Sequence, residues 1–478
     1  MLFSSYEFIF MFLPIVLVVF FGLNFAKVNK VAQQIFLIAV SLYFYYKGCG
    51  NFIVIFIAQI LFNYIIGTLL LRIKANKIVR LIIMWVALAE NVGILFYYKY
   101  TYFFANLSNK LFNSHFSMSI ILLPLGISFF TFRIISYIVD CYNRKAEHYT
   151  LIEYLLFITF FPALTIGPIV RHNEIIPQFK DNKIYKFDLD NFKKGIFIFS
   201  IGLSKKVLIA TPLLSFTNNA FNINSNHNPL ILWIGMFTNL FAFYFDFSGY
   251  TDMAIGISRF FNIELVENFN SPYKARNIQD YWRRWHITLT RFLTDYIFSY
   301  IYKPGSGIAI FCLGTMITFL ISGFWHGAGI NYIIWGLLHG LSMCIIALLA
   351  LKSSKKYLMN KKAARFITMA ALTFLASLYA TDGLRNYYKV LKTLVNFNYF
   401  KSLGLMGSAK DILLTISSNS YTIIILLLSV YICFYTSNTK ELTKKFENNS
   451  RYPIYAGILM LLSLFGLGAT SSFIYFKF

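Results

Sequence analysis

Long apolar runs separated by short polar loops make up most of the 478-residue chain. A helix crosses a bilayer with about 20 consecutive apolar residues, and many of the runs approach or reach that length. The pattern predicts spanning helices at residues 8–23, 31–48, 51–71, 79–98, 117–139, 192–213, 229–247, 363–382, 421–437 and 453–474, with a longer apolar run from about 308 past 347. We therefore expect an all-α polytopic membrane protein of about 11 transmembrane helices.

Residues 151–179 depart from this simple pattern. They are apolar, but Pro162, Gly167 and Pro168 interrupt them. Irregular backbone at membrane depth is tolerated only against protein or a water-filled cavity, so the sequence predicts a broken or re-entrant segment. His172 follows directly and is expected at an interfacial end of that segment.

The loop after the fourth predicted span and the fifth span itself each give one further expectation. The polar residues 99–116 are expected to form a loop outside the membrane. Pro124 and Gly126 lie within the predicted span 117–139, where they predict a kinked or thinned helix.

Composition supports the membrane assignment and narrows the choice of partners. Only 13% of the residues are charged, against about 25% in a soluble domain, and 58% are hydrophobic. The basic residues behind the net charge of +24 gather in short loops, at 27–30, 72–80, 352–362 and 440–445. This pattern indicates cytoplasmic loops and attraction to anionic membrane lipids.

No basic groove with interleaved aromatic residues is present, so we expect no nucleic-acid partner. The five cysteines show neither paired nor metal-ligand spacing, and we expect no metal.

Two histidines stand in unusual contexts. His326 lies in Phe324-Trp325-His326-Gly within an apolar run, and His286 ends Asp280-Tyr-Trp-Arg-Arg-Trp-His286. A histidine at membrane depth costs free energy unless it is hydrogen-bonded or lines a wet cavity. We therefore expect both to line one buried tunnel.

His339 is expected to serve packing rather than this site. It comes thirteen residues after His326, which is about 19 Å of continuous helix. It could share a site with His326 only if the helix breaks at residues 327–329.

Polar and aromatic residues near the histidines are candidates for a substrate path. Arg283, Arg284 and Lys274 could attract the charge of an anionic donor, and Trp282 and Trp285 are candidate tunnel residues beside them. The alternative for this stretch is an aromatic and basic anchor at the membrane interface. The stretch holding Asp246, Ser248, Tyr250 and Asp252 is a second candidate wall. The alternative for that stretch is a satisfied polar network that fixes helix packing.

The residue types limit the chemistry. A buried neutral histidine is a suitable general base, because burial lowers its pKa and keeps the ring unprotonated. A Gly-x-Ser-x-Gly nucleophile elbow, a phosphate-binding glycine-rich loop and the repeated intramembrane carboxylates of a proton pump are all missing. Of the reaction classes considered, histidine-assisted acyl transfer or hydrolysis is the one that these residues still permit.

The histidine motifs carry a resemblance to a known family. These motifs, with the further segments given below, resemble the corresponding segments of the membrane-bound O-acyltransferase family. The closer similarity is to its bacterial branch of alginate and peptidoglycan O-acetyltransferases and the D-alanyl transfer protein of teichoic acid. The matching segments are Phe3-Ser-Ser, Leu123-Pro-Leu-Gly-Ile-Ser-Phe, Phe161-Pro, Gly167-Pro-Ile-Val-Arg171, Phe245-Asp-Phe-Ser-Gly-Tyr250, both histidine motifs and Trp335-Gly-Leu-Leu-His-Gly340.

This resemblance implies a fold and a set of roles. The expected fold is a helical bowl around a central tunnel in one integral membrane domain, 1–478. Residues 1–116 would be N-terminal helices, 117–350 the tunnel core and 351–478 C-terminal helices. His326 matches the family's catalytic histidine and His286 its second tunnel histidine, with Trp325 beside them.

The resemblance also implies partners. Acetyl-CoA or an acyl carrier would donate the acyl group, with no bound cofactor. A separate periplasmic SGNH-type O-acetyltransferase is expected to complete transfer to a polysaccharide. The implied location is the bacterial cytoplasmic (inner) membrane, among membrane lipids.

Three alternatives stay open. D-alanyl transfer to teichoic acid is less favoured, because the Trp-Arg-Arg-Trp-His run resembles the acetyltransferase members. A broken-helix transporter with midplane histidines would suit residues 160–171. A scaffold that only docks the periplasmic enzyme is the third.

Overall fold

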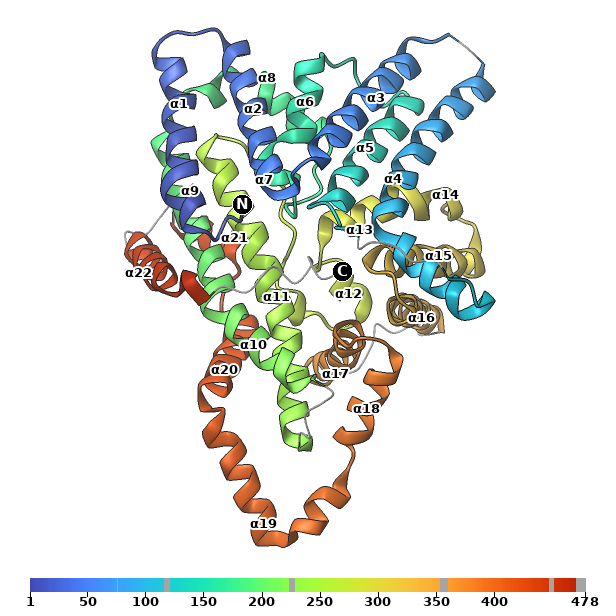
Figure 1. Cartoon of the computed structure of the whole chain (residues 1–478), viewed down its shortest axis with the longest axis vertical. Helices are drawn as coiled ribbons and strands as arrows, with labels where there is room; N and C mark the ends of the chain where they lie inside the picture. Colours follow the sequence, from blue (N-terminus) through green and yellow to red (C-terminus); the bar gives the residue numbers. More distant parts are fainter. Residues whose placement is uncertain (75, 116–120, 223–227, 353–359, 447–450, 470–478) are drawn as a thin grey trace. The chain divides into compact units, whose positions relative to one another are not determined.

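The computed structural model describes residues 1–74, 76–115, 121–222, 228–352, 360–446 and 451–469, and every regular element in them is helical (Figure 1). The chain forms two compact units. The first comprises Met1–Ser200 and Tyr250–Glu267, and the second comprises Ile201–Gly249 and Asn268–Phe478. The expected all-α class is confirmed, whereas the predicted subdivision at 116 and 350 stays a prediction.

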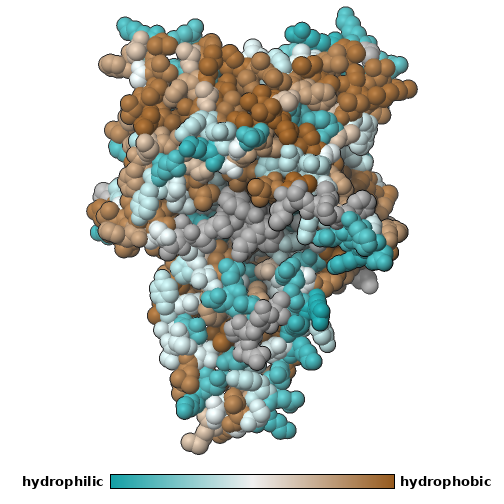
Figure 2. Space-filling view, viewed as in Figure 1, coloured by the Kyte–Doolittle hydropathy of each residue, from teal (hydrophilic) through white to brown (hydrophobic). Residues whose placement is uncertain are grey.

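The first unit contains the N-terminal helices. In order they are η1(Glu7–Phe12), α1(Leu13–Phe25), α2(Lys30–Cys49), α3(Phe52–Arg72), α4(Lys77–Phe112), α5(Ile127–Tyr142), α6(Leu151–Thr159), α7(Phe161–Leu164), α8(His172–Lys180), η2(Asn182–Tyr185) and most of α9(Leu189–Ser204). Figure 2 shows apolar side chains over α1, α2, α3 and the first part of α4, as expected of helices that face lipid. In Figure 1 the basic loop after α1 lies at the same end as the end of α3 and the start of α4, as the loop charges predict.

The second unit contains the helices around both histidine motifs. They are η3(Lys205–Ala210), α10(Thr211–Ala220), part of α11(Pro229–Phe260), η4(Pro272–Lys274), α12(Ile278–Trp282), α13(Ile287–Leu293), η5(Thr294–Phe298), α14(Ser299–Ile301), α15(Gly307–His326), α16(Ile330–Lys352), α17(Lys361–Ala380), α18(Leu384–Leu394), α19(Phe397–Ser418), α20(Ser420–Tyr435), α21(Thr439–Phe446), α22(Arg451–Gly466) and η6(Leu467–Ala469).

Eight helices of the described residues are long and apolar enough to cross a membrane, or nine if α18 to α20 form one bent span. The chain is therefore a multi-pass membrane protein, and the predicted number of about 11 spans is not confirmed. Residues 470–474 of the last predicted span, residues 117–120 of the fifth and residues 353–359 of the third basic loop lie outside the described residues.

Two helices run further than the hydrophobic pattern predicts. α4 continues through the expected loop at 99–116 as far as Phe112, because residues 94–112 contain neither glycine nor proline. The next residue, Asn113, adopts left-handed backbone with φ 52°. α11 likewise extends beyond residue 247 to Phe260. The polar residues after position 98 and after position 247 therefore do not end these two helices.

The fifth predicted span begins later than expected. α5 starts at Ile127, and Pro124 and Gly126 precede it instead of kinking it. Gly126 has φ +71°, and a Cβ at this position would lie 2.8 Å from the Cα of Thr165. Glycine is required here because it permits both the left-handed backbone and the close approach of the α7 to α8 connection.

The prediction of a broken segment at 151–179 is confirmed. α6, α7 and α8 are short, and irregular backbone separates α7 from α8. His172 begins α8, but it is buried rather than interfacial. Its Nε2 lies 3.0 Å from Asp140 Oδ2, and its Nδ1 lies 2.9 Å from the Tyr149 hydroxyl. The carboxylate and the phenol compensate the burial of the ring, which hydropathy does not reveal.

α15 and α16 form a tight helical hairpin that positions the second histidine motif. Gly323 of α15 faces Gly336 of α16, and a Cβ on either would collide with backbone of the other helix. The missing side chains let the two backbones approach closely, as in many membrane helix pairs. The hairpin turn at residues 327–329 thus folds α16 back along α15.

Candidate active site

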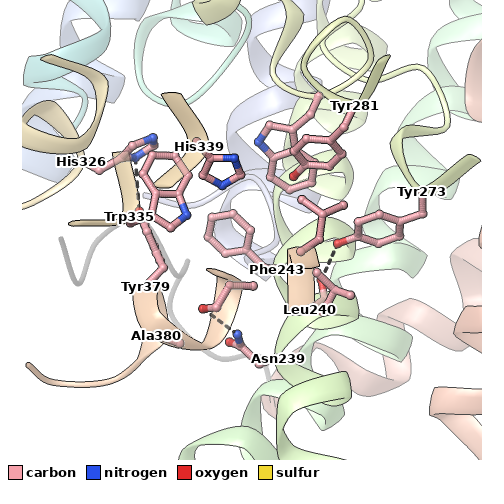
Figure 3. A pocket seen from close by; sticks show the side chains of 13 residues that line it. Asn239, Leu240, Phe243, Tyr273, Tyr281, His326, Trp335, His339, Tyr379 and Ala380 are labelled. Carbon is pink, nitrogen blue, oxygen red and sulfur yellow. Dashed lines mark hydrogen bonds between the residues drawn. The ribbon is translucent and has the colours of Figure 1, made fainter. Parts of the chain in front are cut away.

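A small cavity lies in the second unit, between α11, the α12–α13 region, α15, α16 and α17 (Figure 3). Its volume is about 40 Å³, which is room for a few water-sized groups. Its lining consists of Asn239, Leu240, Phe243, Tyr273, Tyr281, Trp285, His326, Trp335, His339, Leu372, Ala376, Tyr379 and Ala380. The wall is therefore mostly aromatic and aliphatic, with two imidazoles in it.

His326 enters this cavity because α15 ends on it. Gly327 has extended backbone, with φ −166°, and α16 begins at Ile330. The His326 side chain is 5% exposed, and its Nδ1 lies 3.3 Å from the hydroxyl oxygen of Tyr379. The ring also packs edge-on against Trp335. The structure thus holds the predicted catalytic histidine in a fixed orientation at the cavity wall.

His339 lines the same cavity, so it lies in the site of His326 and not apart from it as expected. The condition named for a shared site, a helix break at residues 327–329, is met. Figure 3 shows the Trp335 ring between the imidazoles of His326 and His339, with ring centroids 4.9 and 4.6 Å away. His339 is 2% exposed, and its Nδ1 accepts a hydrogen bond of 3.2 Å from the indole N–H of Trp282.

His286 is fully buried between α12 and α13, with left-handed backbone at φ 44°. Its Nδ1 lies 3.2 Å from the Asn268 side-chain oxygen, which also accepts from the Thr288 backbone N–H and hydroxyl. Because that oxygen only accepts, Nδ1 carries a proton and the lone pair belongs to Nε2. Burial lowers the pKa of His286 and keeps the ring neutral.

His286 does not belong to the lining of the cavity described above. The Trp325 ring packs against both histidines, with centroids 6.4 Å from His286 and 4.7 Å from His326. The two motifs are thus connected through one indole. Asn268, which orients His286, was missed in the sequence, since nothing about an isolated asparagine before the motif indicates this contact.

The tryptophans and arginines of the first motif separate into different positions. Trp285 lines the histidine cavity, whereas Trp282 and Arg283 line a second cavity of about 380 Å³. Its other lining residues are Gln279, Thr290, Leu293, Thr294, Phe298, Phe311, Thr315, Thr318, Phe319, Ser322 and Met343. Trp282 therefore separates the second cavity from His339.

The three candidate cations differ in what they can bind. Arg284 forms an ion pair with Asp280, with Nε 2.7 Å from Oδ1. Lys274 donates to the backbone carbonyl of Thr436 at 2.8 Å. Arg283 is exposed at the second cavity, which leaves it the best placed of the three to meet an anionic group.

The stretch of α11 predicted as a polar wall does not line the histidine cavity. Asp246 is fully buried and forms an ion pair with Lys206, which is 2% exposed. The Tyr250 hydroxyl lies 2.7 Å from Thr165 Oγ1, and Ser248 is buried on the same helix. These contacts favour the alternative of a polar network that fixes helix packing. Among the described residues, no group of three histidine, cysteine or carboxylate side chains is arranged to hold a metal.

The comparisons with known proteins agree on one family. The family model for membrane-bound O-acyltransferases matches residues 83–381. The chain is 35% identical to a peptidoglycan O-acetyltransferase of Helicobacter pylori over 100% of this chain and 98% of that protein. It is 37% identical to a probable alginate O-acetylase of Pseudomonas aeruginosa, over 75% of this chain and 68% of the other. A teichoic acid D-alanyltransferase of Bacillus subtilis is 32% identical over 46% of this chain and 58% of its own length.

Proposed function

Because this chain belongs to the membrane-bound O-acyltransferase family and is an O-acyltransferase of the membrane, we propose that it transfers acetyl groups from acetyl-CoA to a cell-envelope polysaccharide. Relatives named for peptidoglycan and for alginate support this substrate class. Peptidoglycan is the better supported acceptor, since the Helicobacter pylori relative matches over nearly the whole of both chains. Family membership also argues against the transporter and scaffold alternatives.

One observation carries the proposal: the small cavity with His326 and His339 in its wall. A cavity of about 40 Å³ suits a two-carbon acyl group better than a long chain. Aromatic walls exclude water, which would otherwise hydrolyse a thioester. His326 is the proposed base, and a neutral buried imidazole suits that role.

The second cavity supports the choice of donor. It is larger, it shares Trp282 with the surroundings of His339, and Arg283 lies at its wall. The pantetheine arm of CoA alternates apolar carbon groups with amides, and the phosphates at its far end are anionic. We assign this cavity to the arm, with Arg283 near the phosphates.

The remaining parts of the proposal follow from the family resemblance. His286, held by Asn268, orients the acceptor side of the path. A separate periplasmic SGNH-type O-acetyltransferase completes transfer to the glycan, and the protein works in the bacterial inner membrane.

The test is the O-acetyl content of purified envelope polysaccharides from cells that make wild-type protein or His326→Ala at equal level. We expect acetyl esters to fall in one glycan fraction of the variant, which also identifies the acceptor. Unchanged acetyl esters with loss of D-alanyl esters would replace this proposal by D-alanyl transfer. Unchanged esters of both kinds would refute it.

A further inference from the structure

The hydrogen bond between Trp282 and His339 determines where the imidazole carries its proton. An indole N–H can only donate, so Nδ1 of His339 must be the acceptor, at 3.2 Å. A neutral imidazole carries one proton, which therefore resides on Nε2. Both partners are buried, with exposures of 5% and 2%, so water does not compete for this bond.

His326 has a different partner and therefore different possibilities. The Tyr379 hydroxyl can donate to Nδ1 or accept from it, so it permits either tautomer. When Nδ1–H donates to the phenol oxygen, Nε2 of His326 carries the lone pair that a base requires. The two histidines of the cavity can thus present opposite functions, a lone pair and an N–H group.

We propose that His339 is a catalytic residue that donates a hydrogen bond from Nε2–H to the thioester oxygen, and that Trp282 is the positioning residue that maintains this tautomer. This inference rests on the acetyl transfer proposed above. Both imidazoles line the one cavity, on either side of the Trp335 ring. The proposal places the thioester carbonyl in this cavity, with the attacking hydroxyl toward His326 and the carbonyl oxygen toward His339.

His326 takes the proton of an acceptor hydroxyl while its oxygen forms a bond to the thioester carbonyl carbon. The carbonyl electron pair moves to oxygen, where the His339 N–H stabilises the negative charge. Collapse of this tetrahedral species breaks the carbon–sulfur bond, and the leaving thiolate takes the proton from His326. The products are an acetyl ester and CoA thiol.

A fixed tautomer matters because only the tautomer with the proton on Nε2 lets His339 present a donor to that charge. Donors that already point at the developing oxyanion cost no reorganisation during the reaction, and losing one typically lowers kcat by about 100-fold or more. Without the indole N–H, His339 could move its proton to Nδ1 and present a lone pair to the oxyanion instead.

The first test compares two substitutions at position 339. His339→Gln keeps an N–H donor and a carbonyl that can accept from Trp282, whereas His339→Leu removes both. We expect kcat for acetyl transfer to fall about 100-fold in His339→Leu and less than tenfold in His339→Gln, with the KM for acetyl-CoA unchanged in both. Equal losses in the two variants would contradict a donor role and indicate a base.

The second test concerns Trp282. Trp282→Phe keeps an aromatic ring but lacks the N–H group, and we expect kcat to fall about tenfold. The ¹⁵N solid-state NMR spectrum, with the His339 signals identified by their loss in His339→Leu, reports the tautomer directly. We expect an unprotonated Nδ1 in the wild type and a mixture of tautomers in Trp282→Phe.

These measurements separate this inference from the proposed function. If the wild type does not use acetyl-CoA, the proposed function fails, and the NMR spectrum still decides the tautomer. If the wild type is active and His339→Leu transfers acetyl at the same rate, the catalytic role of His339 fails alone. A protonated Nδ1 in the wild type would overturn the role of Trp282.

Discussion

His172 in the first unit and His326 in the second are both buried among aromatic rings, yet their surroundings differ. Both ring nitrogens of His172 have partners, Asp140 and Tyr149, at 3.0 and 2.9 Å. Its ring lies edge-on to Tyr137 and Phe157. His326 instead lines a cavity and shares it with His339.

Burial alone therefore does not make a histidine catalytic. A ring with a carboxylate on one nitrogen and a phenol on the other holds helices together, because moving its proton would break a buried hydrogen bond. A ring at a cavity wall can meet a substrate. We therefore expect changes at His172 to affect stability and changes at His326 to affect rate.

The largest effect is expected for His326→Ala. Acetyl transfer from labelled acetyl-CoA in membrane vesicles should fall by about 1,000-fold or more, because the base is lost. The temperature of unfolding in detergent should change little. A variant that keeps a tenth of the wild-type rate would place the base elsewhere.

His172→Leu should show the opposite behaviour. It removes the imidazole that contacts the buried Asp140 carboxylate, and we expect the free energy of unfolding to fall by about 3 kcal/mol. The transfer rate per folded molecule should stay that of the wild type. Loss of rate without loss of stability would contradict a purely structural role for His172.

Asp246 extends the comparison to a carboxylate within the second unit. Asp246→Asn removes the negative charge of the buried ion pair with Lys206, so we expect a loss of stability of about 3 kcal/mol. The double variant Lys206→Met/Asp246→Leu should recover much of this stability and retain transfer. Folded but inactive protein from the double variant would favour a substrate-path role for Asp246.

Arg283→Gln should have the smallest effect. It removes one charged donor at the larger cavity, and we expect the KM for acetyl-CoA to rise about five- to tenfold with kcat unchanged. Arg276→Gln is the matched control, because it removes the same charge from another exposed position. An equal rise in both variants would show a general charge effect and no specific contact.

The sequence predicted the architecture and one half of the candidate site. Apolar runs indicated an all-α membrane protein with many spanning helices, though not their number. Pro162 with Gly167 and Pro168 identified the broken segment, and both signals are local. The Trp-His-Gly triplet identified His326 for the same reason.

Other features depend on contacts that the chain order does not show. His339 joins His326 only because Gly323 and Gly336 let α15 and α16 fold tightly against each other. The ion pair of Asp246 needs Lys206, forty residues earlier. Asn268 and Trp282 likewise acquire their roles from tertiary contacts with His286 and His339.

Filling the histidine cavity without changing either histidine tests most directly whether acyl transfer takes place there. Ala376 lines the cavity on α17, and Ala363 is exposed on the same helix, so Ala376→Leu and Ala363→Leu make the same change inside and outside it. We expect acetyl transfer to fall at least about tenfold in Ala376→Leu alone, because reacting groups displaced by about 1 Å lose much of their rate. Both variants should unfold at the wild-type temperature. Wild-type transfer by folded Ala376→Leu would contradict the claim that acyl transfer takes place in this cavity.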